Sequence, residues 1–132
     1  MLLFLSLAFS VATFGEELSA TSKQEIAHLF SYLEKSGCEF YRNGAWAQSQ
    51  EASAHLQKKY QYLLSRGRLV STESFIARAA SQSSMSGKPY RVRCGTASVV
   101  ESGPWFRAEL ENYRKRNKSH SGAEKDYPKT EK

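Results

Sequence analysis

Four serines, a glycine and a lysine are concentrated between residues 81 and 90, in the order Ser-Gln-Ser-Ser-Met-Ser-Gly-Lys-Pro-Tyr. Hydroxyls, backbone N–H groups and one ammonium can together bind an anion. The segment lacks the Gly-x-x-x-x-Gly-Lys spacing of a phosphate-binding loop, and Met85 occupies the position where a Ser-x-x-Lys motif requires serine. A structural turn whose hydroxyls bond to neighbouring backbone is the alternative interpretation. The candidate binding residues in this loop are Ser83, Ser84, Ser86, Gly87, Lys88 and Tyr90.

A second candidate is the tripeptide Arg42-Asn43-Gly44. Because Asn-Gly is a strong signal for a tight turn, we expect Arg42 at the end of a strand. A guanidinium in that place can bind a carboxylate or phosphate through two N–H groups. A salt bridge to a nearby Glu, or hydrogen bonds to loop carbonyls, is the alternative. His55 lies one residue off the apolar face of a predicted helix, as either a half-buried structural residue or a general base.

Other signatures of catalysis are missing from the sequence. It contains neither a Gly-x-Ser-x-Gly nor a His-Glu-x-x-His motif. No Asp precedes Asp126, which excludes a Ser-His-Asp triad within the domain, although a triad with Glu stays open. Two isolated cysteines lack the paired spacing that zinc favours. The sequence therefore predicts no catalytic residue, no metal ligand and no cofactor.

Cys38 and Cys94 are the only cysteines, and we expect them to form a disulfide. Both lie beside β-prone residues, at 38–42 and 90–94. A bridge over so long a loop stabilises a fold by about 4 kcal/mol on the chain-entropy model. It would also make the two strands neighbours. Arg42 and Lys88 could then lie at the same end of one small sheet.

The elements that must position these residues are helices and short strands. Apolar residues at i, i+3, i+4 and i+7 predict a first helix that ends at Gly37, with a capping box of Ser22 and Glu25, or of Thr21 and Gln24. Further helices are predicted over 49–65, from 71 or 72 to about 80, and from Ser102 onward. Strands are expected at 38–42 and 90–94, with a third around 99–100. The predicted fold is a helix-rich α+β domain of about four helices with a two- to three-stranded sheet.

The first residues of the chain predict where it works. Residues 2–14 carry no charge and are rich in Leu, Phe, Val and Ala. The run is too short to cross a bilayer, which takes about 20 apolar residues. It is typical of a secretory signal peptide, cut after Gly15 or Ala20. A buried N-terminal helix or strand is the alternative. We expect residues 1–20 to be a signal peptide and the mature protein to be periplasmic, with no transmembrane anchor.

The basic character of the chain is concentrated at its C-terminal end. Residues 114–132 contain seven Lys or Arg and three Asp or Glu, which is +4 of the formal charge of +6. We expect a globular domain over 21–116 and a disordered basic tail over 117–132. Export argues against nucleic acid as a partner. In the cell envelope, the tail would meet anionic lipids or polysaccharides, or it would only aid solubility.

Several segments in one order resemble a family of small exported bacterial proteins that is known only as a domain of unknown function. These segments are 40–44, 54–56 with Lys59, 71–76 and 80–90. The resemblance covers about residues 22–115 and implies a compact single domain in a Gram-negative periplasm. It brings no activity, cofactor or catalytic residue with it. We predict a non-enzymatic binding or interaction module for a protein partner or an anionic envelope component. The alternative is a small hydrolase or transferase that uses His55 with a loop serine.

Overall fold

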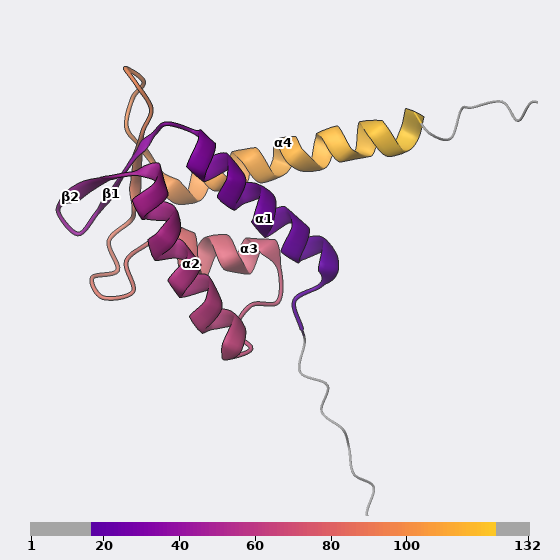
Figure 1. Ribbon diagram of the computed structural model, residues 1–132, viewed down its shortest axis with the longest axis horizontal. Coiled ribbons are helices and arrows are strands. Elements are labelled where there is room, and N and C mark those ends of the chain that lie inside the picture. The colour runs from indigo at the N-terminus through magenta and orange to yellow at the C-terminus, as the bar shows by residue number, and fades with distance from the viewer. Residues whose placement is uncertain (1–16, 124–132) are drawn as a thin grey trace, which may run out of the picture.

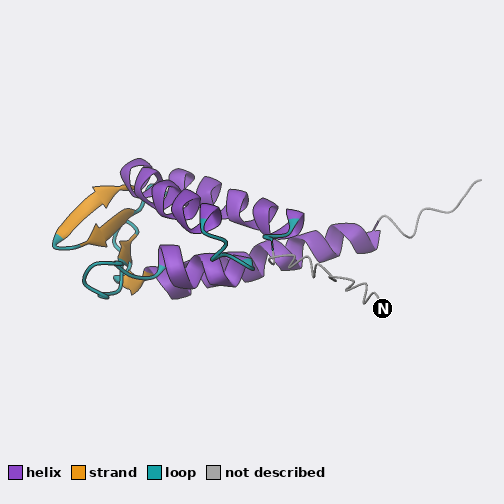
Figure 2. Ribbon diagram, turned by 90° about the horizontal axis from the view of Figure 1, so that it is seen from below, coloured by secondary structure: helices purple, strands orange, loops and turns teal. Residues whose placement is uncertain are grey.

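A computed structural model describes residues 17–123 and shows an α+β domain, as predicted. The helices are α1 (Ala20–Lys35), α2 (Ser49–Ser65), α3 (Thr72–Phe75), which continues into the π-helical η1 (Ile76–Ala80), and α4 (Ser102–Ala123). The strands are β1 (Glu39–Arg42), β2 (Ala45–Gln48), β3 (Arg91–Arg93) and β4 (Val100–Glu101). Figure 1 shows α1 and α2 lying across α3 and α4, and Figure 2 shows the strands together at one end of the helices.

The sheet has four antiparallel strands in the order β2-β1-β3-β4, and not the predicted two or three. The missed strand, β2, has the weakly β-prone sequence Ala-Trp-Ala-Gln. It forms because Asn43 and Gly44, at φ angles of 48° and 89°, make a two-residue turn that pairs Arg42 with Ala45. The turn therefore decides the conformation of a segment whose own residues do not.

Helix α1 begins earlier than predicted, and the expected capping boxes at Ser22 and Thr21 are wrong. Ser19 is the N-cap, and its side chain accepts a hydrogen bond from the backbone N–H of Ser22. Glu25 is buried and binds side chains from other helices instead of the start of its own helix. Leu18, just before the cap, belongs to the core and is 5% exposed.

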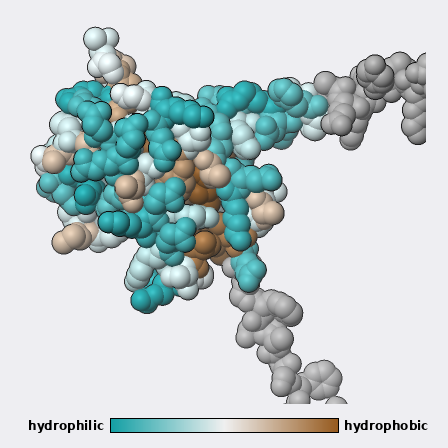
Figure 3. All heavy atoms as spheres, viewed as in Figure 1, coloured by the Kyte–Doolittle hydropathy of each residue, from teal (hydrophilic) through white to brown (hydrophobic). Residues whose placement is uncertain are grey.

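The core lies between the helices. The predicted stripe of α1 is buried against apolar residues of α3, η1 and α4, and Phe30 and Phe75 pack with ring centroids 5.4 Å apart. Ala79 and Phe106 are at most 1% exposed. Figure 3 shows a largely hydrophilic surface whose most apolar colour lies in a recess near the middle of the view.

The predicted disulfide between Cys38 and Cys94 is present, with the two Cα atoms 4.4 Å apart. Its cysteines adjoin the antiparallel pair of β1 and β3, in which Glu39 lies opposite Arg93. Because Tyr41 lies opposite Arg91, the end of β1 and the start of β3 lie side by side. The bridge and the ladder thus hold the same two strands together.

The boundary expected at residue 116 falls inside α4, which continues to Ala123. Residues 117–123 of the expected tail are therefore helical, and the helix projects beyond the domain in Figure 1. The ion pair of Arg114 with Glu25 of α1 holds α4 against the domain just before this segment. The rest of the predicted tail and residues 1–16 of the predicted leader lie outside the described residues. Between residues 17 and 123, no helix combines the length and the apolar character needed to span a membrane.

Candidate functional site

A small pocket opens between the sheet, the start of α4 and helix α2. Its cavity volume is about 40 Å³, and its floor is apolar, with Phe40, Leu56, Ala80 and Phe106 buried. Polar side chains stand around this floor, namely Arg42, Glu51, His55 and the hydroxyl-bearing Tyr90. An apolar concavity with a few convergent polar groups is the usual form of a ligand site.

Simple periodicities of strand and helix bring the polar groups to the pocket. Phe40 and Arg42 are two positions apart on β1, so both side chains project from one face of the sheet. Glu51, His55 and Lys59 follow one another at intervals of four on α2, which places them along one face of that helix. The antiparallel register then sets Tyr90, just before β3, close to the end of β1.

The hydroxyl of Tyr90 joins α2 to this edge of the sheet. It lies 3.2 Å from Nε2 of His55 and 3.2 Å from Nζ of Lys59. Lys59 also donates to the backbone carbonyl of Gln82 at 2.9 Å, and its ammonium lies 5.0 Å from the centre of the Tyr90 ring. Since an ammonium has only donors, the Tyr90 oxygen accepts from Lys59. The hydroxyl is also hydrogen-bonded to Nε2 of His55, and the tautomer of the ring sets which of the two donates.

The electrostatic environment supports a neutral His55. Burial lowers the pKa of His55, and the nearby charges of Arg42, Lys59 and Lys58 lower it further. Burial also lowers the pKa of Lys59 to about 8, with a second contribution from Arg42. Burial raises the pKa of Tyr90, an effect that Arg42 opposes. The site is therefore a place where positive charges crowd one another at a partly desolvated surface.

Within residues 17–123, neither Arg42 nor Lys59 forms an ion pair with an acidic side chain. Arg42 is exposed at the rim, where its guanidinium makes no side-chain hydrogen bond to another described residue. The only acidic residue in the described lining of the pocket is Glu51. Such a cluster of cations can bind an anion through charge-assisted hydrogen bonds.

The serine-rich loop forms a turn that is held by its own hydrogen bonds. The buried hydroxyl of Ser83 accepts hydrogen bonds from the backbone N–H groups of Met85 and Ser86. Ser83 and Lys88 also pair through their backbone, and Gly87 donates to the carbonyl of Ser83 at a φ of 70°. This is the structural turn that the sequence left as the alternative.

The structure separates the predicted candidates into two groups. Arg42, His55 and Tyr90 line the pocket. Asn43 instead accepts a hydrogen bond from the hydroxyl of Ser86 at 3.2 Å, which joins the tip of the β1–β2 turn, with Gly44, to the serine loop. Ser84 and Lys88 are exposed and do not line the pocket.

Sequence reasoning did not single out Lys59 or Glu51 as site residues. The spacing along α2 could have identified them, because Lys59 lies one turn after His55 and Glu51 lies one turn before it. The apolar floor, which includes Phe40 and Phe106, could not be predicted from local sequence, because its residues come from four different segments of the chain. In the described part of the chain, no group of three His, Cys, Asp or Glu side chains is placed to hold a metal ion.

Comparison with known proteins identifies a family and no individual relative. No curated protein and no solved structure matches the chain. A model of the family of unknown function DUF5329 matches residues 20–114, from the first residue of α1 to Arg114 in α4. The chain therefore belongs to this family.

Proposed function

We propose that this domain is a non-enzymatic binding module of the bacterial periplasm, and that it binds an anionic group in the pocket between β1 and α2. The observation that carries the proposal is the convergence of Arg42, His55 and Lys59 beside one apolar pocket. Neither Arg42 nor Lys59 has an acidic partner among residues 17–123. The anionic group would belong to a protein partner or to an envelope component.

The arrangement is unfavourable for the empty domain, which favours a functional role for it. Lys59 is partly buried, and its two hydrogen bonds go to uncharged oxygens. Arg42 makes a positive charge at this site still less favourable, because it lowers the pKa values of both Lys59 and His55. A bound anion would offset this repulsion and would use the N–H groups of Arg42, which no described side chain engages.

The alternative of a hydrolase or transferase finds less support in the geometry. His55 has its hydrogen bond with the Tyr90 hydroxyl, while the Ser83 hydroxyl bonds within its own loop. Ser102 also lines the pocket, but it is 1% exposed and donates to the carbonyl of Ala80. A nucleophile needs a base within hydrogen-bonding reach, and no such serine lies at His55 in the described structure.

Export remains part of the proposal. The apolar leader supports it, and a disulfide between Cys38 and Cys94 suits an oxidising compartment such as the periplasm.

The experiment is a titration of the isotope-labelled protein with a panel of carboxylates and phosphates, followed by NMR at the Arg42 and His55 side chains. We expect at least one anion to give saturable shifts at both residues. In the Arg42→Gln variant, the affinity should fall about tenfold or more. Arg91→Gln is the matched control, because Arg91 is an exposed arginine on the opposite face of the same sheet. If every anion leaves both side chains unshifted, or if R91Q weakens binding as much as R42Q, the proposal is wrong.

A further inference from the structure

We infer that the group bound in this pocket is a single carboxylate joined to a short apolar tail. The inference rests on the proposed function and names the ligand class of the same site. Charge, size and donor geometry each support it.

The charge around the pocket suits an anion. Among the described residues of the lining, Arg42 and Glu51 carry opposite charges. Lys59, at the Tyr90 hydroxyl, and Lys58, which also acts on His55, each contribute a positive charge. The local sum is therefore positive, as the binding of a carboxylate requires.

The size of the pocket limits the tail. A water molecule needs a cavity volume of about 10–15 Å³. The cavity volume of about 40 Å³ above the floor of Phe40 and Phe106 is therefore large enough for three or four heavy atoms. This is the size of a propyl or isopropyl group. The apolar floor gains free energy when such a group covers it, because apolar surface leaves water.

The donors at the rim suit the planar group of a carboxylate. A guanidinium presents parallel N–H groups that match the two oxygens of a carboxylate, and those of Arg42 are not engaged by described side chains. One guanidinium can serve both oxygens of a carboxylate, but it leaves at least one of the three terminal oxygens of a phosphate monoester without a partner.

Two sources provide this chemistry. One is the C-terminal residue of a polypeptide with a small apolar side chain, and the other is a free short-chain carboxylic acid. Both place a carboxylate three or four carbon atoms from the end of an apolar tail, so the pocket itself does not distinguish them.

The test compares probes that share one tail. The disulfide-intact protein is titrated by NMR with isovalerate, with the neutral isovaleramide and with isobutyl phosphate. We expect isovalerate to bind in the millimolar range, as suits so small a ligand. The amide and the phosphate should bind about tenfold more weakly or worse. Peptides that end in valine, with a free or an amidated terminus, identify the source: tighter binding of the free terminus than of isovalerate indicates a polypeptide.

Two variants test the geometry. Arg42→Lys keeps the charge but loses the paired N–H groups, so it should weaken isovalerate binding several-fold, whereas Lys88→Arg, in the exposed loop outside the pocket, should not change it. Isobutyl phosphate that binds as tightly as isovalerate would overturn the carboxylate assignment and leave the anion-binding function standing. Equal binding of isovaleramide and isovalerate would also overturn the carboxylate assignment. If isovalerate and every anion of the panel give no saturable shifts, both the assignment and the proposed function are wrong.

Discussion

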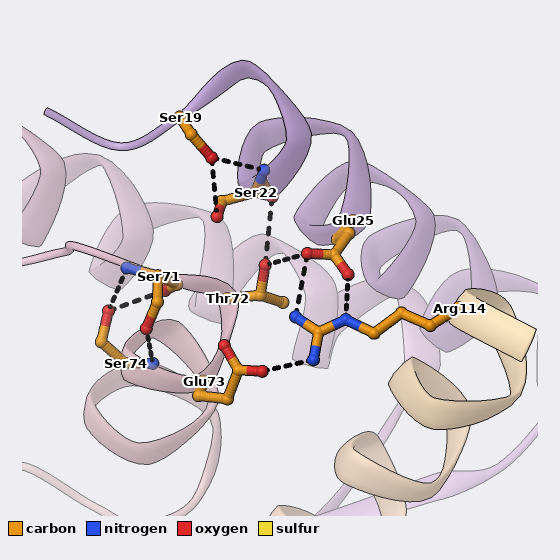
Figure 4. Close-up of polar contacts among 8 residues, drawn as sticks. All are labelled: Ser19, Ser22, Glu25, Ser71, Thr72, Glu73, Ser74 and Arg114. Carbon is orange, nitrogen blue, oxygen red and sulfur yellow. Dashed lines mark hydrogen bonds and ion pairs between the residues drawn. The ribbon is translucent and has the colours of Figure 1, made fainter. Parts of the chain in front are cut away.

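The guanidinium of Arg114 on α4 binds the buried carboxylate of Glu25 on α1, 89 residues earlier in the chain. Its Nε and one terminal nitrogen donate to the two oxygens of Glu25, and its other terminal nitrogen donates to Glu73 of α3. The hydroxyl of Thr72 also donates to Glu25, at 2.9 Å. Figure 4 shows these side chains from three helices pointing toward one another. One arginine thus joins α4 to both α1 and α3.

We predict that Arg114→Ala destabilises the protein by about 2–3 kcal/mol, because it leaves the buried Glu25 carboxylate without its cation. The Glu25 side chain is only 6% exposed, so water does not replace the lost partner well. Urea unfolding, monitored by circular dichroism, measures the change. Lys115→Ala is the control, since Lys115 pairs with Glu111 on the exposed face of the same helix. Lys115→Ala should change the free energy of unfolding by no more than about 0.5 kcal/mol. An equal loss of stability in both variants would contradict the role of the buried pair.

A second prediction concerns the stability cost of the pocket. Lys59→Met should raise the melting temperature by a few degrees, because it removes a partly buried cation from the field of Arg42. The carbonyl of Gln82, which loses this donor, belongs to an exposed residue and can bond water instead. The neighbouring Lys58 is exposed, so Lys58→Met should change the melting temperature little. Differential scanning calorimetry measures both variants, and a marked fall for K59M would mean that Lys59 is a structural residue.

A third prediction concerns pH. The groups around the His55 ring are Arg42 on β1, Lys58, Lys59 and Glu51 on α2, and the Tyr90 hydroxyl. Burial and the cations hold the pKa of His55 below its usual 6.5 in the folded protein. The unfolded chain therefore binds the proton first as the pH falls through about 6.5, and the free energy of unfolding decreases over that range. His55→Gln should remove this part of the pH dependence.

The same histidine reports on binding. A bound anion should raise the pKa of the His55 ring, because it offsets the charges of Arg42 and Lys59. NMR titration of the ring with and without ligand tests this. A pKa that stays the same in the saturated complex would place the anion elsewhere.

A fifth prediction concerns the position at which the proposed leader is cut. Leu18 is part of the core and Ser19 caps α1, so a cut after Ala20 would remove both. We expect a protein that starts at Thr21 to be less stable than one that starts at Glu16, by about 3 kcal/mol for the apolar side chain and the cap together. We therefore predict that, if the protein is exported as proposed, its leader is cut near Gly15. Intact-mass measurement of the periplasmic protein tests the position, and a start at residue 21 would contradict the prediction.

Sequence alone predicted the features that depend on neighbours in the chain. Helix α2 has the predicted bounds of 49–65, and the apolar stripe of α1 is buried as its spacing required. Ser71 caps α3, and Asn43-Gly44 makes the predicted turn. The pairing of Cys38 with Cys94 followed from there being only two cysteines. Each of these rests on a periodicity, a turn preference or a count that a few residues contain.

Tertiary structure decided which side chains meet across long separations. Arg42, His55 and Tyr90 were candidates from separate motifs, but their pocket exists because β1 lies antiparallel to β3 and α2 packs against β1 and β2. Lys59 became part of the site through its contact with Tyr90, 31 residues away. The serine-rich loop was the densest group of candidate binding residues in the sequence. In the structure, the Ser83 hydroxyl instead bonds to backbone N–H groups of the same loop. Local spacing predicts the face of a helix or strand, but only packing fixes the neighbour opposite that face, because the contact depends on elements that are far apart in the chain.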